Sequence, residues 1–264
     1  MPAASAKPRS AGRRPWAVRS RNKSTSALRR YLEGSRTPLT SLLFVLPLLV
    51  LHEVGVQYYA TLPGRVVAYR VAAFDLMVRL FHSCGASGQY LPALAVVAVL
   101  LSWHVARGDR WVVNTPLLPA MLVECLLLAT PLLAVYFLFS WPTSVFMPGG
   151  DWKSMAALYL GAGVYEELVF RLAAFSVLSF LLIDLARIPR SWGVPAVVLT
   201  AAALFAGYHI WGQTGYPFQG LVFVALRGVY YGTIFVERGF GITAGVHTAY
   251  DLMLLALREM NARA

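Results

Sequence analysis

Residues 153–184 read KSMAALYLGAGVYEELVFRLAAFSVLSFLLID, and this stretch decides the class of fold. It is almost continuously apolar and exceeds the roughly 20 residues with which a helix crosses the hydrocarbon core of a bilayer. Glu166, Glu167 and Arg171 lie in its middle, where a charged side chain costs roughly 2.5–3.5 kcal/mol on insertion scales. The stretch therefore predicts a membrane-spanning helix that carries functional polar groups.

The rest of the chain has the same character. Of its 264 residues, 58% are hydrophobic and 13% are charged, and this charged share is about half that of a soluble domain. The composition excludes a disordered protein and an ordinary soluble enzyme. We predict an all-α, polytopic membrane helix bundle over residues 39–258, with about seven transmembrane helices and six or eight as alternatives. The expected spans are 40–60, 89–105, 115–140, 153–184, 193–211, 218–236 and 240–257.

Two segments outside these spans have their own patterns. Residues 1–38 hold ten basic residues and one acidic residue, which predicts a largely disordered cytoplasmic tail that contacts anionic lipids. Because the remaining chain is nearly neutral, a nucleic-acid-binding surface is not expected. Residues 64–83 mix arginines with apolar residues and predict an interfacial amphipathic helix, with a further span as the alternative.

The acidic pair in the first stretch has a spacing that suits catalysis. Glu167 and Arg171 are four residues apart and can pair on a helix, whereas Glu166 is turned by about 100° and can face another partner. Two adjacent carboxyl groups in a low dielectric suit general acid–base chemistry. Gly161 and Gly163 allow another helix to approach closely just before this pair.

Later spans carry further acid–base groups. His247 and Asp251 are four residues apart on one helix face, where they could bind a metal, polarise water or donate to an oxyanion. His209 lies on a third helix, and a lone intramembrane His most often forms a structural hydrogen bond between helices. Because three helices each supply such groups, a catalytic site is favoured.

The motif order Glu-Glu-x-x-x-Arg, Phe-x-x-x-His and His-x-x-x-Asn/Asp resembles the CPBP family of intramembrane proteases, which are bacterial relatives of the CAAX prenyl endopeptidase. The matching residues, within about 150–257, are Glu166, Glu167, Arg171, Phe205, His209, His247 and Asp251. The resemblance implies a helical membrane fold with a water-filled cavity and an endopeptidase acting on a membrane-associated protein or peptide. Removal of C-terminal sorting signals or peptide maturation is implied by analogy, and the bacterial inner membrane is the implied location, with the N-terminus in the cytoplasm.

The resemblance also implies a role for each matching residue. Glu166 and His209 would activate a water molecule against a peptide carbonyl. His247 and the residue at position 251 would stabilise the oxyanion. The supporting residues would be Glu167, Arg171 and Phe205.

The sequence leaves alternatives open for both the cofactor and the function. We favour a mechanism without a cofactor, while Zn²⁺ or another divalent metal held by Glu166, His209, His247 and Asp251 is the alternative. Asp251 stands where related processing enzymes commonly have Asn, and an ionised Asp would repel an oxyanion unless it is protonated, paired with His247 or bound to a metal. A non-catalytic membrane scaffold and a proton-coupled transporter are the alternative functions.

Three further expectations concern placement. Glu124 and Arg227 are expected to pair across two helices, with Arg227 in the substrate cavity as the alternative. His52 and Glu53 are expected to be solvated near an interface. Straight helices with the span limits above place His209 nearer the outer face than His247, by on the order of 10 Å.

Overall fold

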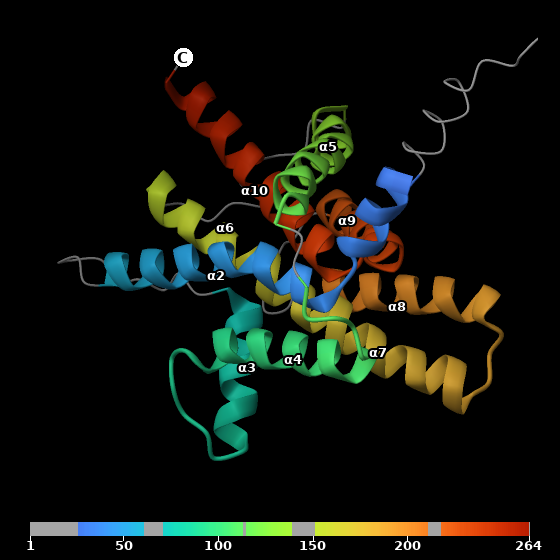
Figure 1. The fold of residues 1–264 in the computed structure, drawn as a ribbon. Helices are drawn as coiled ribbons and strands as arrows, with labels where there is room; N and C mark the ends of the chain where they lie inside the picture. The colour runs from blue at the N-terminus through green and yellow to red at the C-terminus, as the bar shows by residue number, and fades with distance from the viewer. Residues whose placement is uncertain (1–25, 61–70, 113–114, 139–150, 211–217, 264) are drawn as a thin grey trace, which may run out of the picture.

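The structure confirms the predicted all-α class. The computed structural model describes residues 26–60, 71–112, 115–138, 151–210 and 218–263, and every regular element in these ranges is helical (Figure 1). Among the described residues, six helices are long and apolar enough to cross a membrane, and α4 (Leu91–Arg107) is apolar but shorter. The six are α2 (Pro38–Ala60), α5 (Leu117–Leu138), the segment Trp152–Leu185, α8 (Arg190–Ile210), α9 (Phe218–Arg238) and α10 (Phe240–Arg263). The chain is therefore an integral membrane protein with a polytopic helix bundle.

The segment 152–185 is not the single regular α-helix that its sequence predicts. It consists of α6 (Trp152–Glu167), the π-helical η2 (Leu168–Ala173), α7 (Ala174–Ser179) and the π-helical η3 (Phe180–Leu185). The first π-helical turn starts directly after Glu167 and contains Arg171. Such turns are rare and occur frequently at functional sites.

Helix α10 lies at the centre of the bundle. It packs against α2, α5, α6 and α9. Its most apolar stretch is 72% buried, against at most 44% for the other spanning helices. The side chains of α10 are therefore held by neighbours on several sides, as a precise site requires.

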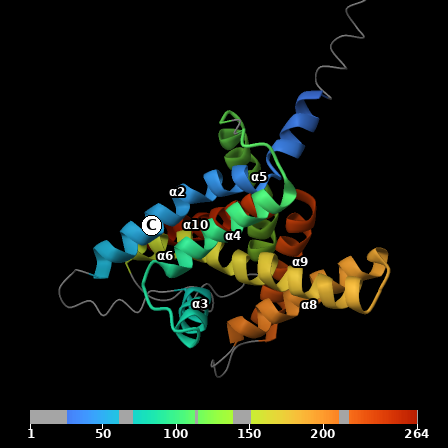
Figure 2. The ribbon, with the colours of Figure 1, turned by 60° about the horizontal axis from the view of Figure 1, so that its bottom comes forward.

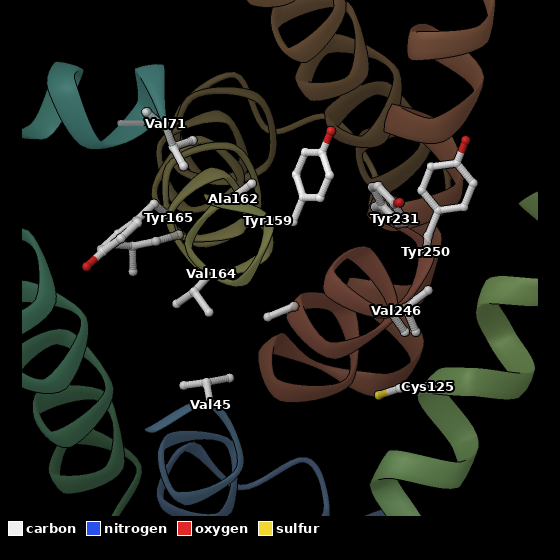
Figure 3. Close-up of a cluster of buried hydrophobic side chains, with 14 of the residues drawn as sticks. Val45, Val71, Cys125, Tyr159, Ala162, Val164, Tyr165, Tyr231, Val246 and Tyr250 are labelled. Carbon is white, nitrogen blue, oxygen red and sulfur yellow. The ribbon is translucent and has the colours of Figure 1, made fainter. Parts of the chain in front are cut away.

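The contact between α6 and α10 depends on Gly163. A Cβ atom at this position would lie 2.0 Å from Thr248 Oγ1 and 2.9 Å from the carbonyl oxygen of Ala244, both on α10. Figure 3 shows Val164 of α6 on the side of Val45 of α2, and Val246 of α10 on the side of Cys125 of α5. The close approach expected from the small residues of α6 is thus confirmed, and Gly161 similarly leaves room for His52.

Helix α3 (Ala72–Ser83) is too short to span a membrane and has one buried face. Phe74 and Met77 are buried, whereas Leu76 and Leu80 are exposed. Helices α2 and α4 run side by side, and α3 lies across their direction (Figures 1 and 2). This one-sided burial agrees with the amphipathic pattern predicted for residues 64–83, of which 64–70 lie outside the described residues, and the interfacial position stays a prediction.

Residues 26–34 are helical, which corrects the expectation of a largely disordered tail for this stretch; residues 1–25 lie outside the described residues. The helix is fixed to the bundle because Tyr31 donates a hydrogen bond to Glu124 on α5. Burial, together with this bond, raises the pKa of Tyr31 well above its usual range. Arg238, at the end of α9, donates to both carboxylate oxygens of Glu124 at 2.5 and 2.8 Å.

Candidate active site

Glu167, the last residue of α6, binds two partners inside the bundle. Its Oε2 lies 3.1 Å from Nε of Arg171, which confirms the pairing predicted from their spacing. Its Oε1 lies 2.7 Å from Nδ1 of His247 on α10. All three side chains are at most 1% exposed. Glu167 therefore fixes the orientation of His247, because a buried carboxylate with two such partners has little freedom to move.

Glu166 points away from this pair, as its position on the helix predicts. Its Oε2 lies 3.8 Å from Nε2 of His209 and 3.8 Å from Nε2 of His247. We expected His209 to lie nearer the outer face of the membrane than His247. This prediction is wrong, because both imidazoles lie at the same distance from Oε2 of Glu166. A separation of 3.8 Å is too long for a direct hydrogen bond, so Glu166 makes none to either histidine.

His209 is oriented from within its own helix. Its Nδ1 lies 2.9 Å from the carbonyl oxygen of Phe205, which can only accept, so the proton is on Nδ1. In the neutral imidazole, Nε2 then carries the lone pair that faces Glu166. The His209 side chain is 23% exposed, which makes it the most accessible member of the group.

Phe205 is fully buried and supports the site through its ring. The guanidinium of Arg171 lies over this ring, 4.3 Å from its centroid, and the His209 ring is 4.4 Å away. Arg171 also donates to the carbonyl oxygen of Gly228 on α9 at 3.3 Å. Contacts among these side chains thus hold η2 against α8 next to His209.

The structure adds Arg227 of α9 to this group. Its Nη2 lies 3.3 Å from Oδ1 of Asp251 and 3.3 Å from Nε2 of His247. Oδ2 of Asp251 lies 3.4 Å from the same Nε2, so the expected pairing of His247 and Asp251 is present. The ring of Tyr231 stacks on His247 at 4.6 Å. Sequence reasoning placed Arg227 in the substrate cavity only as an alternative.

Two expectations about other polar residues are wrong. Glu124 pairs with Arg238 and not with Arg227, because Arg227 is taken by Asp251. His52 is 2% exposed and lies 2.7 Å from the carbonyl oxygen of Ala157, since the bundle closes over this part of α2. Glu53 accepts a hydrogen bond from the hydroxyl of Tyr165 at 2.7 Å.

A guanidinium lies next to two of the residues expected to bind a metal ion. Within the described ranges, no group of three or more His, Cys, Asp or Glu side chains is arranged to hold one. Nη2 of Arg227 lies 3.3 Å from both His247 and Asp251, so a cation bound by these two residues would be close to a guanidinium. Two like charges at such a distance would repel each other strongly inside the bundle.

Buried hydroxyl groups lie beside the ionised residues. The hydroxyls of Tyr159 and Tyr250 have no hydrogen-bond partner among the described residues, although both side chains are buried. Figure 3 shows Tyr159, Tyr231 and Tyr250 together on one side of the contact between α6 and α10. Buried hydroxyls of this kind normally bind water or a ligand. Tyr159 could have been found from sequence, since it precedes Glu166 by two helical turns.

Comparison with known protein families finds a match in the part of the chain that contains the site. Residues 148–253 match the family model described as type II CAAX prenyl endopeptidase Rce1-like. The match contains all seven residues that carry the motifs, from Glu166 to Asp251. Comparisons with curated proteins and with solved structures gave no match.

Proposed function

We infer, from the match of residues 148–253 to the Rce1-like family model, that this membrane protein is an endopeptidase that hydrolyses a peptide bond within or next to the bilayer. The observation that carries this proposal is the position of Glu166, whose Oε2 lies 3.8 Å from the imidazoles of both His209 and His247. A water molecule bound at this point would contact a general base and face two oriented imidazoles.

In the proposed reaction, Glu166 takes a proton from the water molecule as its oxygen attacks the carbonyl carbon of the substrate. His209 accepts a hydrogen bond from the same water through Nε2 and orients it. The carbonyl oxygen becomes an oxyanion at the side of His247 and Asp251. The proton held by Glu166 then passes to the leaving amide nitrogen, the C–N bond breaks, and a carboxylic acid and an amine leave.

Glu167 and Arg171 support the reaction without contacting the substrate in this proposal. Glu167 holds Nδ1 of His247 at 2.7 Å, and Arg171 balances the charge of Glu167 at 3.1 Å. Phe205 packs against Arg171 and His209. Their substitution should therefore alter both folding and catalysis.

We propose that the reaction needs no metal. Arg227 lies 3.3 Å from both Nε2 of His247 and Oδ1 of Asp251, so a metal ion bound by these atoms would be repelled by its guanidinium. Glu166 has no guanidinium partner among the described residues, so its carboxylate is available as a base.

The proposed substrate is a membrane-associated protein or peptide, with C-terminal sorting signals or maturing peptides as the expected classes. The proposed location is the bacterial inner membrane with a cytoplasmic N-terminus, because the ten basic residues of 1–38 favour that side, and anionic lipids are the proposed partners of this tail.

The experiment compares the N- and C-terminal peptides of membrane and surface proteins in host cells that express equal amounts of wild type, Glu166→Gln or Glu237→Gln. Glu237 is the matched control, because its side chain is 70% exposed on α9 and outside the site. Termini that are lost in Glu166→Gln and retained in Glu237→Gln support the protease and identify its substrate. Identical termini in all three strains contradict it and favour a scaffold, or a transporter if solute flux depends on Glu166.

A further inference from the structure

Position 251 poses a chemical problem for the proposed protease. An oxyanion needs hydrogen-bond donors, and the carboxylate of Asp251 has none to offer while it is ionised. The guanidinium of Arg227, 3.3 Å from Oδ1, keeps this carboxylate paired. Asp251 therefore cannot take the role that an Asn at this position would have.

His247 does not solve the problem alone. Its Nδ1 lies 2.7 Å from Oε1 of Glu167, and since a carboxylate can only accept, Nδ1 carries a proton. In the neutral imidazole, Nε2 is then an acceptor and not a donor. Nη2 of Arg227 lies 3.3 Å from this Nε2, which is the arrangement expected when the guanidinium donates to it.

Arg227 has the donors that its neighbours lack. A guanidinium stays protonated and presents five N–H groups with no acceptor. Arg227 is 5% exposed, and its Nε has no hydrogen-bond partner among the described residues. An oxyanion beside His247 can replace Nε2 as the acceptor of this Nη2 N–H group, because the two nitrogens are only 3.3 Å apart.

We propose that Arg227 is a catalytic residue of the protease, which donates hydrogen bonds to the oxyanion in place of residue 251, while Asp251 holds the guanidinium in position. The proposal rests on the proposed function, since it assigns the donor for the same reaction. Rings on two sides keep the guanidinium in place: its Cζ lies 4.7 Å from the centroid of Tyr250 and 5.7 Å from that of Tyr231.

The charges of the site determine which variants test this role. The site holds three carboxylates, Glu166, Glu167 and Asp251, and two guanidiniums, Arg171 and Arg227. Removing Arg227 alone would leave Asp251 buried without a counter-charge, and a loss of activity could then reflect misfolding. Asp251→Asn removes the need for a counter-charge, and the double variant Arg227→Met/Asp251→Asn has the same net charge as wild type.

The experiment measures kcat and KM of purified full-length protein in lipid vesicles. The probe is a quenched-fluorescence peptide that spans a bond whose cleavage depends on Glu166 in cells. We expect Asp251→Asn to lower kcat by about tenfold or less, because Arg227 remains as the donor. We expect the double variant to lose a further factor of about 10² to 10³ in kcat, with KM changed by less than about threefold.

Three results decide the matter. Equal kcat values for Asp251→Asn and the double variant would overturn the proposal, because Arg227 would then only neutralise Asp251. An Asp251→Asn variant as inactive as Glu166→Gln would overturn it too, since Asp251 would act directly. A Glu166→Gln variant that cleaves like wild type would instead overturn the protease assignment, whatever Arg227 does.

A second variant tests the proposal if Arg227→Met/Asp251→Asn does not fold. If the thermal unfolding midpoint of the double variant falls well below that of Asp251→Asn, the test passes to Arg227→Lys/Asp251→Asn. Lys keeps the charge but lacks the planar fork of donors. We expect it to lower kcat at least tenfold relative to Asp251→Asn at a similar midpoint. A kcat equal to that of Asp251→Asn would again overturn the proposal.

Discussion

A methyl group added at Gly163 would separate the two helices that carry the site. In Gly163→Ala, the new Cβ would lie 2.8 Å from the backbone nitrogen of Thr248 and 2.9 Å from the carbonyl oxygen of Ala244, whereas ordinary contacts begin at 3.4 Å. The Thr248 hydroxyl, only 2.0 Å away, can rotate, but the backbone of α10 must retreat. The required shift is about 0.6 Å, the difference between 3.4 Å and the 2.8 Å to the Thr248 nitrogen.

This shift acts directly on the catalytic geometry. The distance of 2.7 Å between Glu167 and His247 would grow to about 3.3 Å, just beyond the upper limit for a good hydrogen bond. Overpacking of this kind costs about 1–3 kcal/mol of stability. Because a displacement of about 1 Å can cost a hundredfold in rate, one of about 0.6 Å should lower kcat/KM about tenfold.

The assay measures the thermal unfolding midpoint in detergent and kcat/KM on the quenched peptide. The matched control is Gly207→Ala on α8, because a Cβ there meets no atom within 4 Å. It should keep wild-type activity and gain up to about 1 kcal/mol from the better helix propensity of Ala. A Gly163→Ala variant with wild-type midpoint and activity would refute the reasoning, as would equal losses in both variants.

Three more predictions follow from the contacts of the described residues. Glu167→Gln should lower both the unfolding midpoint and kcat, by about 3–5 kcal/mol in stability, because it leaves Arg171 buried without its counter-charge. Arg238→Met should cost about 1–3 kcal/mol in stability and leave kcat unchanged, since its partner Glu124 lies in a separate cluster. EDTA or 1,10-phenanthroline, followed by gel filtration, should leave the cleavage rate of the purified enzyme unchanged.

Different outcomes would count against each of these. A Glu167→Gln variant with unchanged kcat would show that the orientation of His247 does not matter for the reaction. A large fall in kcat for Arg238→Met would connect that cluster to the site. Activity that is lost after chelation and restored by Zn²⁺ would contradict the metal-free mechanism.

The sequence predicted the parts of the site that depend on helical periodicity. Four-residue spacings were sufficient for the pair Glu167–Arg171 and for the contact of His247 with Asp251. The opposite direction of Glu166 followed from the rotation of one residue along a helix. The all-α class and most of the spans followed from the length of apolar stretches. These features are local, so they need no knowledge of how the helices pack.

The features that the sequence did not predict depend on packing between helices. Arg227 has no polar residue at helical spacing that would reveal Asp251 as its partner, and Glu124 was an equally good candidate from sequence alone. The depth of His209 depends on where α8 starts and how it lies against α6. The π-helical turn after Glu167 and the burial of His52 beneath Gly161 likewise follow from tertiary contacts.

The most direct test of the central claim is the cleavage of the identified peptide by purified protein in lipid vesicles containing H₂¹⁸O. Mass spectrometry then measures the labelled oxygen in the new carboxyl group. The account predicts that wild type and Glu237→Gln produce a carboxyl group with one ¹⁸O atom at similar rates, and that Glu166→Gln produces less than about 1% of that amount. Labelled product formed by Glu166→Gln at the wild-type rate would contradict the account, because Glu166 would then not be the base that activates water.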